Sequence, residues 1–138
     1  MPSYRLIDLE GIGPANSRKM DEAKIKTVRG LLQKGGTPKG RKELAQSTGI
    51  SESVILKWVN FADLFRINGI GTQYSELLEK AGVDTVKELR TRNAENLVAS
   101  LKKANEAGGR RLVRVVPGLK RARTWIAEAK KLKPAVTY

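Results

Sequence analysis

The stretch Leu9-Glu10-Gly11-Ile12-Gly13-Pro14 returns 58 residues later as Ile67-Asn68-Gly69-Ile70-Gly71-Thr72. The match continues in the same register through Ser17 and Ser75, Met20 and Leu78, Ala23 and Ala81, Ile25 and Val83, Thr27 and Thr85, and Leu31 and Leu89. An internal repeat of this kind indicates a duplicated structural unit. We therefore predict two repeats, residues 1–64 and residues 65–138.

The composition narrows the class of protein. The 138 residues include 27 Lys and Arg against 14 Asp and Glu, a net charge of +13, with no cysteine and no histidine. Without these two residue types the chain lacks disulfides, thiolate metal sites and the commonest general base. No apolar run is long enough to span a membrane, and the first residues do not resemble a secretory signal. We expect a cytoplasmic protein that is not an enzyme and uses no cofactor.

The positive charge is unevenly placed. Residues 1–64 carry 11 basic and 7 acidic side chains, whereas residues 65–138 carry 16 and 7. Within the second repeat, Glu106 is the one acidic residue in the stretch 102–123, whose basic residues are Lys102, Lys103, Arg110, Arg111, Arg114, Lys120, Arg121 and Arg123. Part of this stretch, near 102–115, is an insertion relative to the first repeat. We predict that it contacts a polyanion.

Turn and capping signals predict an all-α fold of short helices. In the first repeat we expect a helix from Pro14 to about Lys24, and a second helix that Thr27 caps and Gly35-Gly36 ends. One or two helical turns over residues 42–47 follow. Ser51 then caps a longer helix whose inward face carries Val54, Ile55, Trp58, Val59 and Ala62.

The second repeat follows the same plan. It has a helix over residues 71–81, and Thr85 stands three residues before Glu88 in a capping-box pattern. A loop near residues 106–109 precedes the last helix, which begins after residues 116–119 and turns Ala122, Trp125, Ile126 and Ala129 to the core. We place both Trp58 and Trp125 in the core. A short, loose tail ends the chain after Pro134.

Four turns share one pattern, a glycine and a branched apolar residue followed by a helix start. They are Gly11-Ile12-Gly13, Gly49-Ile50-Ser51, Gly69-Ile70-Gly71 and Gly118-Leu119-Lys120. The pattern resembles the helix-hairpin-helix motif, with small Ser17 and Ser75 four residues past the second glycine. From about Leu6 to Leu132 the chain resembles small bacterial proteins made of two tandem paired helix-hairpin-helix units. The resemblance implies two pseudo-symmetric units and sequence-independent DNA binding through the backbone.

The residues expected to contact phosphate follow from their position relative to the glycine turns. Amides at a helix N-terminus favour phosphate oxygens. In the first repeat the expected contacts are Gly11, Ile12, Gly13, Ala15, Asn16, Arg18 and Lys19, and in the second they are Gly69, Ile70, Gly71, Thr72 and Gln73. The second repeat departs from the pattern, because Glu76 and Glu79 stand where the first has basic residues. Lys39, Arg41 and Lys42 are further candidates for the phosphate backbone.

Three alternatives stay open. The glycine turns could be purely structural, with the basic face recruiting an acidic protein or RNA. Residues 44–60 also resemble a helix-turn-helix, whose recognition helix would show Ser51, Glu52, Ser53, Leu56, Lys57 and Asn60 to DNA bases. Relatives with the hairpin motif include glycosylases, ligases and nucleases, although no separate catalytic domain fits in this chain. We predict a binding protein for nucleic acid, with duplex DNA favoured and without a small-molecule substrate.

Overall fold

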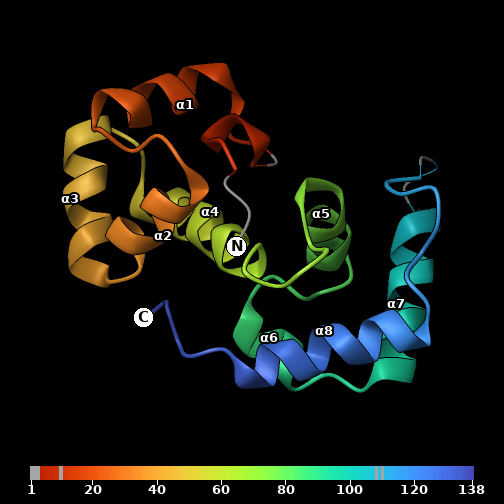
Figure 1. Ribbon diagram of the computed structural model, residues 1–138. Coiled ribbons are helices and arrows are strands. Elements are labelled where there is room, and N and C mark those ends of the chain that lie inside the picture. Colours follow the sequence, from red (N-terminus) through yellow and green to blue (C-terminus); the bar gives the residue numbers. More distant parts are fainter. Residues whose placement is uncertain (1–3, 10, 108, 110) are drawn as a thin grey trace. The chain divides into compact units, whose positions relative to one another are not determined.

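The computed structural model describes residues 4–9, 11–107, 109 and 111–138 of the chain. The fold is all-α, as predicted, and no strand forms among these residues. After a short 3-10 turn, η1 (Leu6–Asp8), the helices are α1 (Gly13–Glu22), α2 (Val28–Gly35), α3 (Pro38–Thr48), α4 (Glu52–Leu64), α5 (Thr72–Lys80), α6 (Val86–Arg90), α7 (Ala94–Ala107) and α8 (Leu119–Lys131) (Figure 1). In the described part of the chain, none of these helices has the length and apolar character needed to cross a bilayer.

The chain forms two compact units. Unit 1 comprises residues 1–63 together with residues 134–138, and unit 2 comprises residues 64–133. The chain therefore leaves unit 1 once and returns to it at Pro134. Each unit has its own aliphatic core with a single tryptophan, Trp58 in unit 1 and Trp125 in unit 2, and both side chains are buried as predicted.

Unit 1 begins with the first glycine turn, residues 11–13. Gly11 and Gly13 both have positive φ angles, 81° and 70°, a conformation that side chains disfavour. Between them the Ile12 side chain is 1% exposed and enters the core. The turn directs the chain into α1, which begins at Gly13 and ends at Glu22, two residues before the predicted end.

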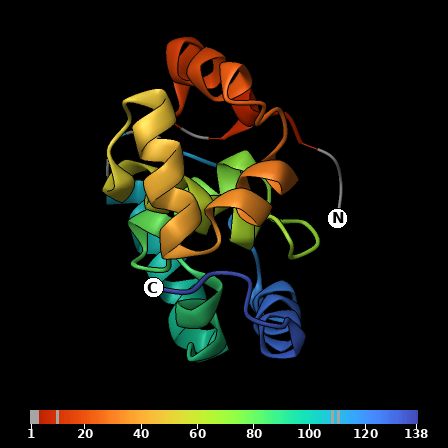
Figure 2. The same ribbon diagram turned by 90° about the vertical axis from the view of Figure 1, so that its left-hand side faces the viewer.

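Two threonines start the next helices of unit 1. The Thr27 hydroxyl accepts a hydrogen bond from the Gly30 amide at 3.0 Å and caps α2, which ends at Gly35 as predicted. The Thr37 hydroxyl accepts from the Gly40 amide at 3.1 Å, with Pro38 in the first helical turn. Helix α3 is therefore longer than the turn or two predicted over residues 42–47, because Thr37-Pro38 is a helix start. Helices α2 and α3 pack side by side (Figure 2).

Helix α4 provides much of the core of unit 1. Ile55, Trp58, Val59 and Ala62 are buried, as predicted. The prediction for Val54 is wrong, since its side chain is 39% exposed at the first turn of the helix. Phe61 and Leu64 are buried as well, so the second half of α4 is enclosed on more than the predicted face.

The segment 134–138 is an ordered part of unit 1, so the predicted loose tail is wrong. The Thr137 amide donates to the Gly36 carbonyl at 2.7 Å, and Val136 is buried. Arg41, only 5% exposed, donates to the carbonyl oxygens of Gly35 at 2.9 Å and Thr137 at 2.7 Å. The guanidinium of Arg41 is therefore a structural clamp, and its expected contact with a phosphate backbone is not available.

Unit 2 begins with the second glycine turn, residues 69–71. Gly69 has a φ of 86°, whereas Gly71 is extended, with φ −119° and ψ −155°. The Ile70 side chain is 1% exposed, like Ile12. Helix α5 follows, from Thr72 to Lys80. Ser75 is fully buried, and its hydroxyl donates to the Thr72 carbonyl at 2.9 Å.

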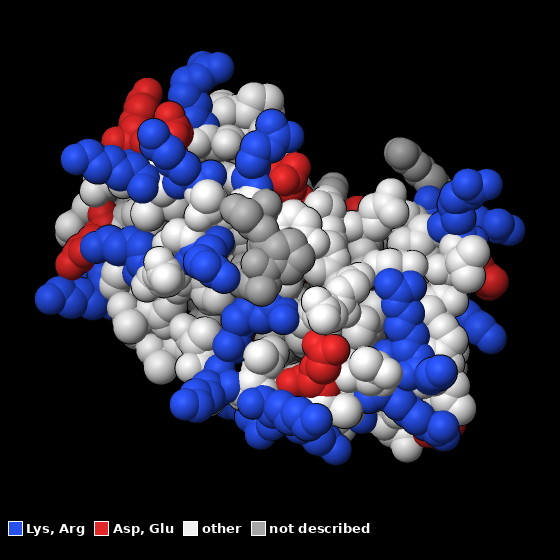
Figure 3. Space-filling view, viewed as in Figure 1, with Lys and Arg blue, Asp and Glu red and all other residues white. Residues whose placement is uncertain are grey.

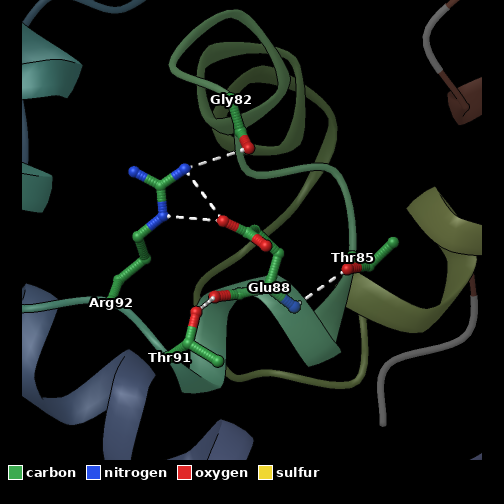
Figure 4. A network of polar contacts seen from close by, with 5 residues as sticks. All are labelled: Gly82, Thr85, Glu88, Thr91 and Arg92. Carbon is green, nitrogen blue, oxygen red and sulfur yellow. Dashed lines mark hydrogen bonds and ion pairs between the residues drawn. The ribbon is translucent and has the colours of Figure 1, made fainter.

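A polar network fixes the short helix α6 (Figure 4). The Thr85 hydroxyl accepts from the Glu88 amide at 2.9 Å, which confirms the predicted cap. The Glu88 carboxylate pairs with Arg92 at 3.0 Å instead of returning to the cap, so the box is half formed. The Arg92 guanidinium also donates to the Gly82 carbonyl at 3.2 Å and ties α6 to the preceding turn.

Helix α8 packs against α6 and α7 (Figure 1, Figure 2). Its buried residues are Ala122, Trp125, Ile126 and Ala129, as predicted. The segment between α7 and α8 is held by Asn105, which is 4% exposed. The Asn105 side chain accepts from the amides of Leu112 at 2.8 Å and Val113 at 3.1 Å, and donates to the Val113 carbonyl at 3.1 Å.

Candidate nucleic-acid interface

Two glycine-preceded helix starts meet in unit 2 around one open pocket. Gly69 belongs to the second glycine turn, before α5, and Gly118 immediately precedes α8. The pocket has a volume of about 640 Å³, and its lining consists of Asn68, Gly69, Gly118, Lys120, Arg121, Thr124, Trp125 and Glu128. We call it the turn pocket. It combines helix N-termini, backbone amides and two cations, the groups that bind phosphate oxygens.

Arg121 lines this pocket and contacts two aromatic rings. Its guanidinium carbon lies 4.8 Å from the centre of the Tyr74 ring and 5.4 Å from the Trp125 ring, within range of a cation-π interaction. The guanidinium also donates to the Tyr74 hydroxyl at 3.3 Å. A Cβ atom on Gly69 would lie only 3.1 Å from Arg121 Nη2. The second glycine turn is therefore close to a cation that comes from α8, 52 residues further along the chain.

The rim of the turn pocket already binds an anionic oxygen. The Asn68 amide donates to Glu128 Oε2 at 3.1 Å. The Asn68 amide is therefore already paired with a carboxylate of the same unit. Glu128 also offsets part of the charge of Lys120 and Arg121, so an incoming phosphate meets a mixed rim with an excess of positive charge.

The first glycine turn has different surroundings. A Cβ atom on Gly11 or Gly13 would meet nothing within 4 Å, so this turn faces open space. Beside it, a pocket of about 390 Å³ is lined by Arg5, Leu6, Ile7, Pro14, Ser17, Arg18, Asp21, Ile25 and Lys26. Its three cations face one carboxylate. Another molecule can approach the backbone of this turn without displacing a side chain.

The helix starts differ in their caps. At the starts of α2, α3, α4, α6 and α7, a backbone amide donates a hydrogen bond to a side-chain oxygen. The accepting residues are, in that order, Thr27, Thr37, Ser51, Thr85 and Asn93. Helices α1, α5 and α8 have no side-chain cap, and each follows one of the glycine patterns. The fourth pattern, Gly49-Ile50-Ser51, resembles the other three in sequence but its helix is capped by Ser51.

The structure brings together only part of the predicted contact set. Lys120, Arg121 and Gly69 line the turn pocket, and Arg18 lines the pocket of unit 1. Lys19, Lys102, Lys103, Arg111 and Arg114 are exposed but line neither pocket. Arg110 lies outside the described residues. Figure 3 shows lysine and arginine side chains along the part of unit 2 that carries α8.

Several cations are paired with carboxylates. Arg123 donates to Glu95 at 3.3 Å, and Arg92 pairs with Glu88. In unit 1 the Lys34 ammonium hydrogen-bonds to Glu43, and this contact lowers the pKa of the Glu43 carboxyl below its usual value. These cations are partly compensated within the protein. Among the residues described, no three potential metal ligands of the His, Cys, Asp or Glu type lie together.

The recognition surface expected for the helix-turn-helix alternative is partly engaged within unit 1. The Asn60 side-chain oxygen accepts a hydrogen bond from the Tyr138 hydroxyl at 3.0 Å. The Lys57 ammonium lies 6.0 Å from the centre of the Phe61 ring. The Ser51 hydroxyl also caps α4 and hydrogen-bonds to the Ser53 hydroxyl, so four of the six residues expected to read bases have partners in their own unit.

From the sequence we missed Asn68, Thr124 and Glu128 as members of the turn pocket, and Tyr74 as a partner of Arg121. One signal was available, because Arg121 and Trp125 are four residues apart on a helix and so share a face. Glu128 continues the same face seven residues after Arg121. The contact of this face with Gly69 has no local signal, since it depends on how α8 packs in unit 2.

Together, these features define an all-helical protein with two basic units, each carrying an apolar glycine turn before an uncapped helix. Residues 10–132 match the model of the domain of unknown function DUF4332, and the chain belongs to this family. No curated protein and no solved structure gives a significant match to the chain.

Proposed function

We propose that this protein binds nucleic acid, with duplex DNA favoured, through backbone phosphates and with little sequence preference. The turn pocket carries the proposal. It places Lys120 and Arg121 beside Gly118, at the uncapped start of α8, and beside Gly69 of the second glycine turn, where the Asn68 amide donates to a carboxylate oxygen at 3.1 Å. The negative charge of a phosphate group is complementary to the positive end of a helix, and phosphate oxygens accept hydrogen bonds from the backbone amides there.

The two glycine turns fit tandem helix-hairpin-helix units in this proposal. Equivalent hydrogen bonds recur 58 residues apart: Ile12 to Leu9 and Ile70 to Ile67, Ile25 to Met20 and Val83 to Leu78, and Leu31 to Thr27 and Leu89 to Thr85, each from amide to carbonyl. The first turn offers open backbone with Arg18 nearby, and the second offers the turn pocket. We propose a non-enzymatic cytoplasmic role, in which both surfaces bind the ligand through positive charge and hydrogen-bond donors.

The test is a titration of duplex DNA, single-stranded DNA and RNA at two salt concentrations. Replacement of condensed counterions makes the affinity fall steeply with salt, by about 0.9 logarithmic units for each phosphate contact per tenfold rise in salt. The K120Q/R121Q variant should lower this slope by about 2. The matched variant K24Q/R29Q removes two exposed charges of unit 1 and should leave the slope nearly unchanged.

The outcomes separate the candidates. Absence of duplex binding at about 50 mM salt, or a flat response to salt, would overturn the proposal. Binding to RNA with no binding to duplex DNA would favour the RNA alternative. An equal decrease of the salt slope in both double variants would show that binding depends on net charge and not on the turn pocket.

A further inference from the structure

A second basic groove lies in unit 2 between α6 and α8. Its lining is Lys87, Arg90 and Thr91 from α6 and its C-cap, and Lys130 from the last turn of α8. Its volume is about 470 Å³. All four residues are exposed. The lining holds three cations and, as far as the described residues extend, no carboxylate. We call it the α6/α8 groove.

The neighbouring carboxylates are committed to other partners. Glu88, between Lys87 and Arg90 in sequence, pairs with Arg92 at 3.0 Å (Figure 4). Glu128, two residues before Lys130, accepts the Asn68 amide at 3.1 Å. Neither of these carboxylates lines the α6/α8 groove.

The fold gives no reason for gathering these cations. A lysine or arginine near the C-terminus of its own helix stabilises that helix. That effect acts within each helix and does not need the basic ends of two helices to share one groove. Bringing like charges together is unfavourable, and a bound anion reverses the sign of the interaction. The groove is therefore arranged for an anionic ligand with several charges.

The α6/α8 groove and the turn pocket lie on opposite flanks of α8. Arg121 and Lys130 are nine residues apart, which at about 100° per residue places them about 180° apart around the helix. The same interval corresponds to about 14 Å along the helix axis. The face between these flanks on the inner side is the buried stripe that contains Trp125 and Ala129. A phosphate group bound at one flank does not reach the other.

We infer that the α6/α8 groove is a second phosphate-binding site, which holds a nucleic-acid segment other than the one in the turn pocket. This inference rests on the proposed function. Unit 2 then binds two duplex segments at once, one on each flank of α8, and the protein bridges them. The occupant is duplex DNA, because Lys87, Arg90 and Lys130 offer charge without an apolar or base-reading surface.

A two-duplex capture experiment with the full chain tests this. One short duplex is fixed to beads, a second duplex carries a fluorophore, and the protein is added at a constant salt concentration. The K87Q/R90Q/K130Q variant should reduce capture of the second duplex by about tenfold or more, because about three phosphate contacts are lost. The matched variant K24Q/R29Q/K80Q removes three exposed charges elsewhere and should retain most of the capture. The K87R/K130R variant keeps the charge and should behave like the natural protein.

Binding of a single duplex, measured by fluorescence anisotropy, is the second readout. Single-duplex binding without capture by the natural protein overturns the inference and leaves the proposed function standing. Absence of single-duplex binding overturns the proposed function and the inference with it. Equal capture by the K87Q/R90Q/K130Q variant and the natural protein, or equal loss in both triple variants, also overturns the inference. Circular dichroism tests whether each variant is folded. If the triple variant does not fold, K130Q alone should give a partial loss of capture of the second duplex.

Discussion

The two glycine turns share a buried isoleucine but differ in what surrounds their backbones. In unit 1 the turn has two glycines with positive φ and faces open space. In unit 2 the second glycine is extended, and Arg121 from a distant helix lies over the first. The repeated sequence therefore preserves the contact of the isoleucine with the core, whereas the side chains that lie next to the turn depend on the packing of each unit.

The largest effect should come from the feature that the turns share. Ile12→Ala and Ile70→Ala each remove most of a side chain that is 1% exposed, so each should lower the free energy of unfolding of its unit by about 2–5 kcal/mol. Hydrogen exchange resolved by residue measures the two units separately. Exchange should rise in α1 for I12A and in α5 for I70A. If the loss of unfolding free energy in one unit were less than half that in the other, the two isoleucines would not be equivalent.

The second glycine should separate the turns by a smaller effect. Gly13 has a φ of 70°, so Gly13→Ala should cost about 1–2 kcal/mol of unfolding free energy. Gly71 has a φ of −119°, a value open to alanine, so Gly71→Ala should cost less than half as much. Chemical denaturation of the two variants provides the measurement. Equal losses would mean that the close surroundings of Gly71, and not its backbone angle, require glycine.

The smallest effect concerns the cations next to the turns. Arg121→Gln removes the cation from the Tyr74 and Trp125 rings and should destabilise unit 2 by about 0.5–1 kcal/mol. Arg18 is exposed beside the first turn, and Arg18→Gln should leave the stability of unit 1 nearly unchanged. Urea unfolding of both variants measures the difference. A stability loss in R18Q as large as in R121Q would contradict the distinction between the two cations.

Local signals predicted the helix starts well. Thr27 and Thr85 cap the helices predicted from them, and the inward face of α8 contains the four residues read from its periodicity. The errors also have local causes. The helical turns predicted over residues 42–47 are too short, because threonine before proline is a favourable helix start and α3 begins at Pro38. Val54 was placed in the core although it lies in the first turn of α4, where its side chain is exposed.

The candidate site was only partly predictable. Basic residues near the glycine turns are visible in the sequence, but Arg121 reaches Gly69 through tertiary packing across 52 residues. The burial of Arg41 also depends on a distant partner, the Thr137 carbonyl 96 residues away. Charge composition thus identifies a class of partner, whereas only the three-dimensional structure tells which cations are exposed and which are held.

The return of residues 134–138 to unit 1 has a consequence for the order of folding during synthesis. Unit 2 is contiguous from residue 64 to residue 133, whereas unit 1 is assembled from two segments that flank it in the sequence. Unit 1 lacks Val136 and the Thr137 carbonyl for Arg41 until the ribosome has added them. Unit 1 therefore cannot complete its structure before unit 2 has been synthesised, in contrast to domains that fold one after another as they emerge.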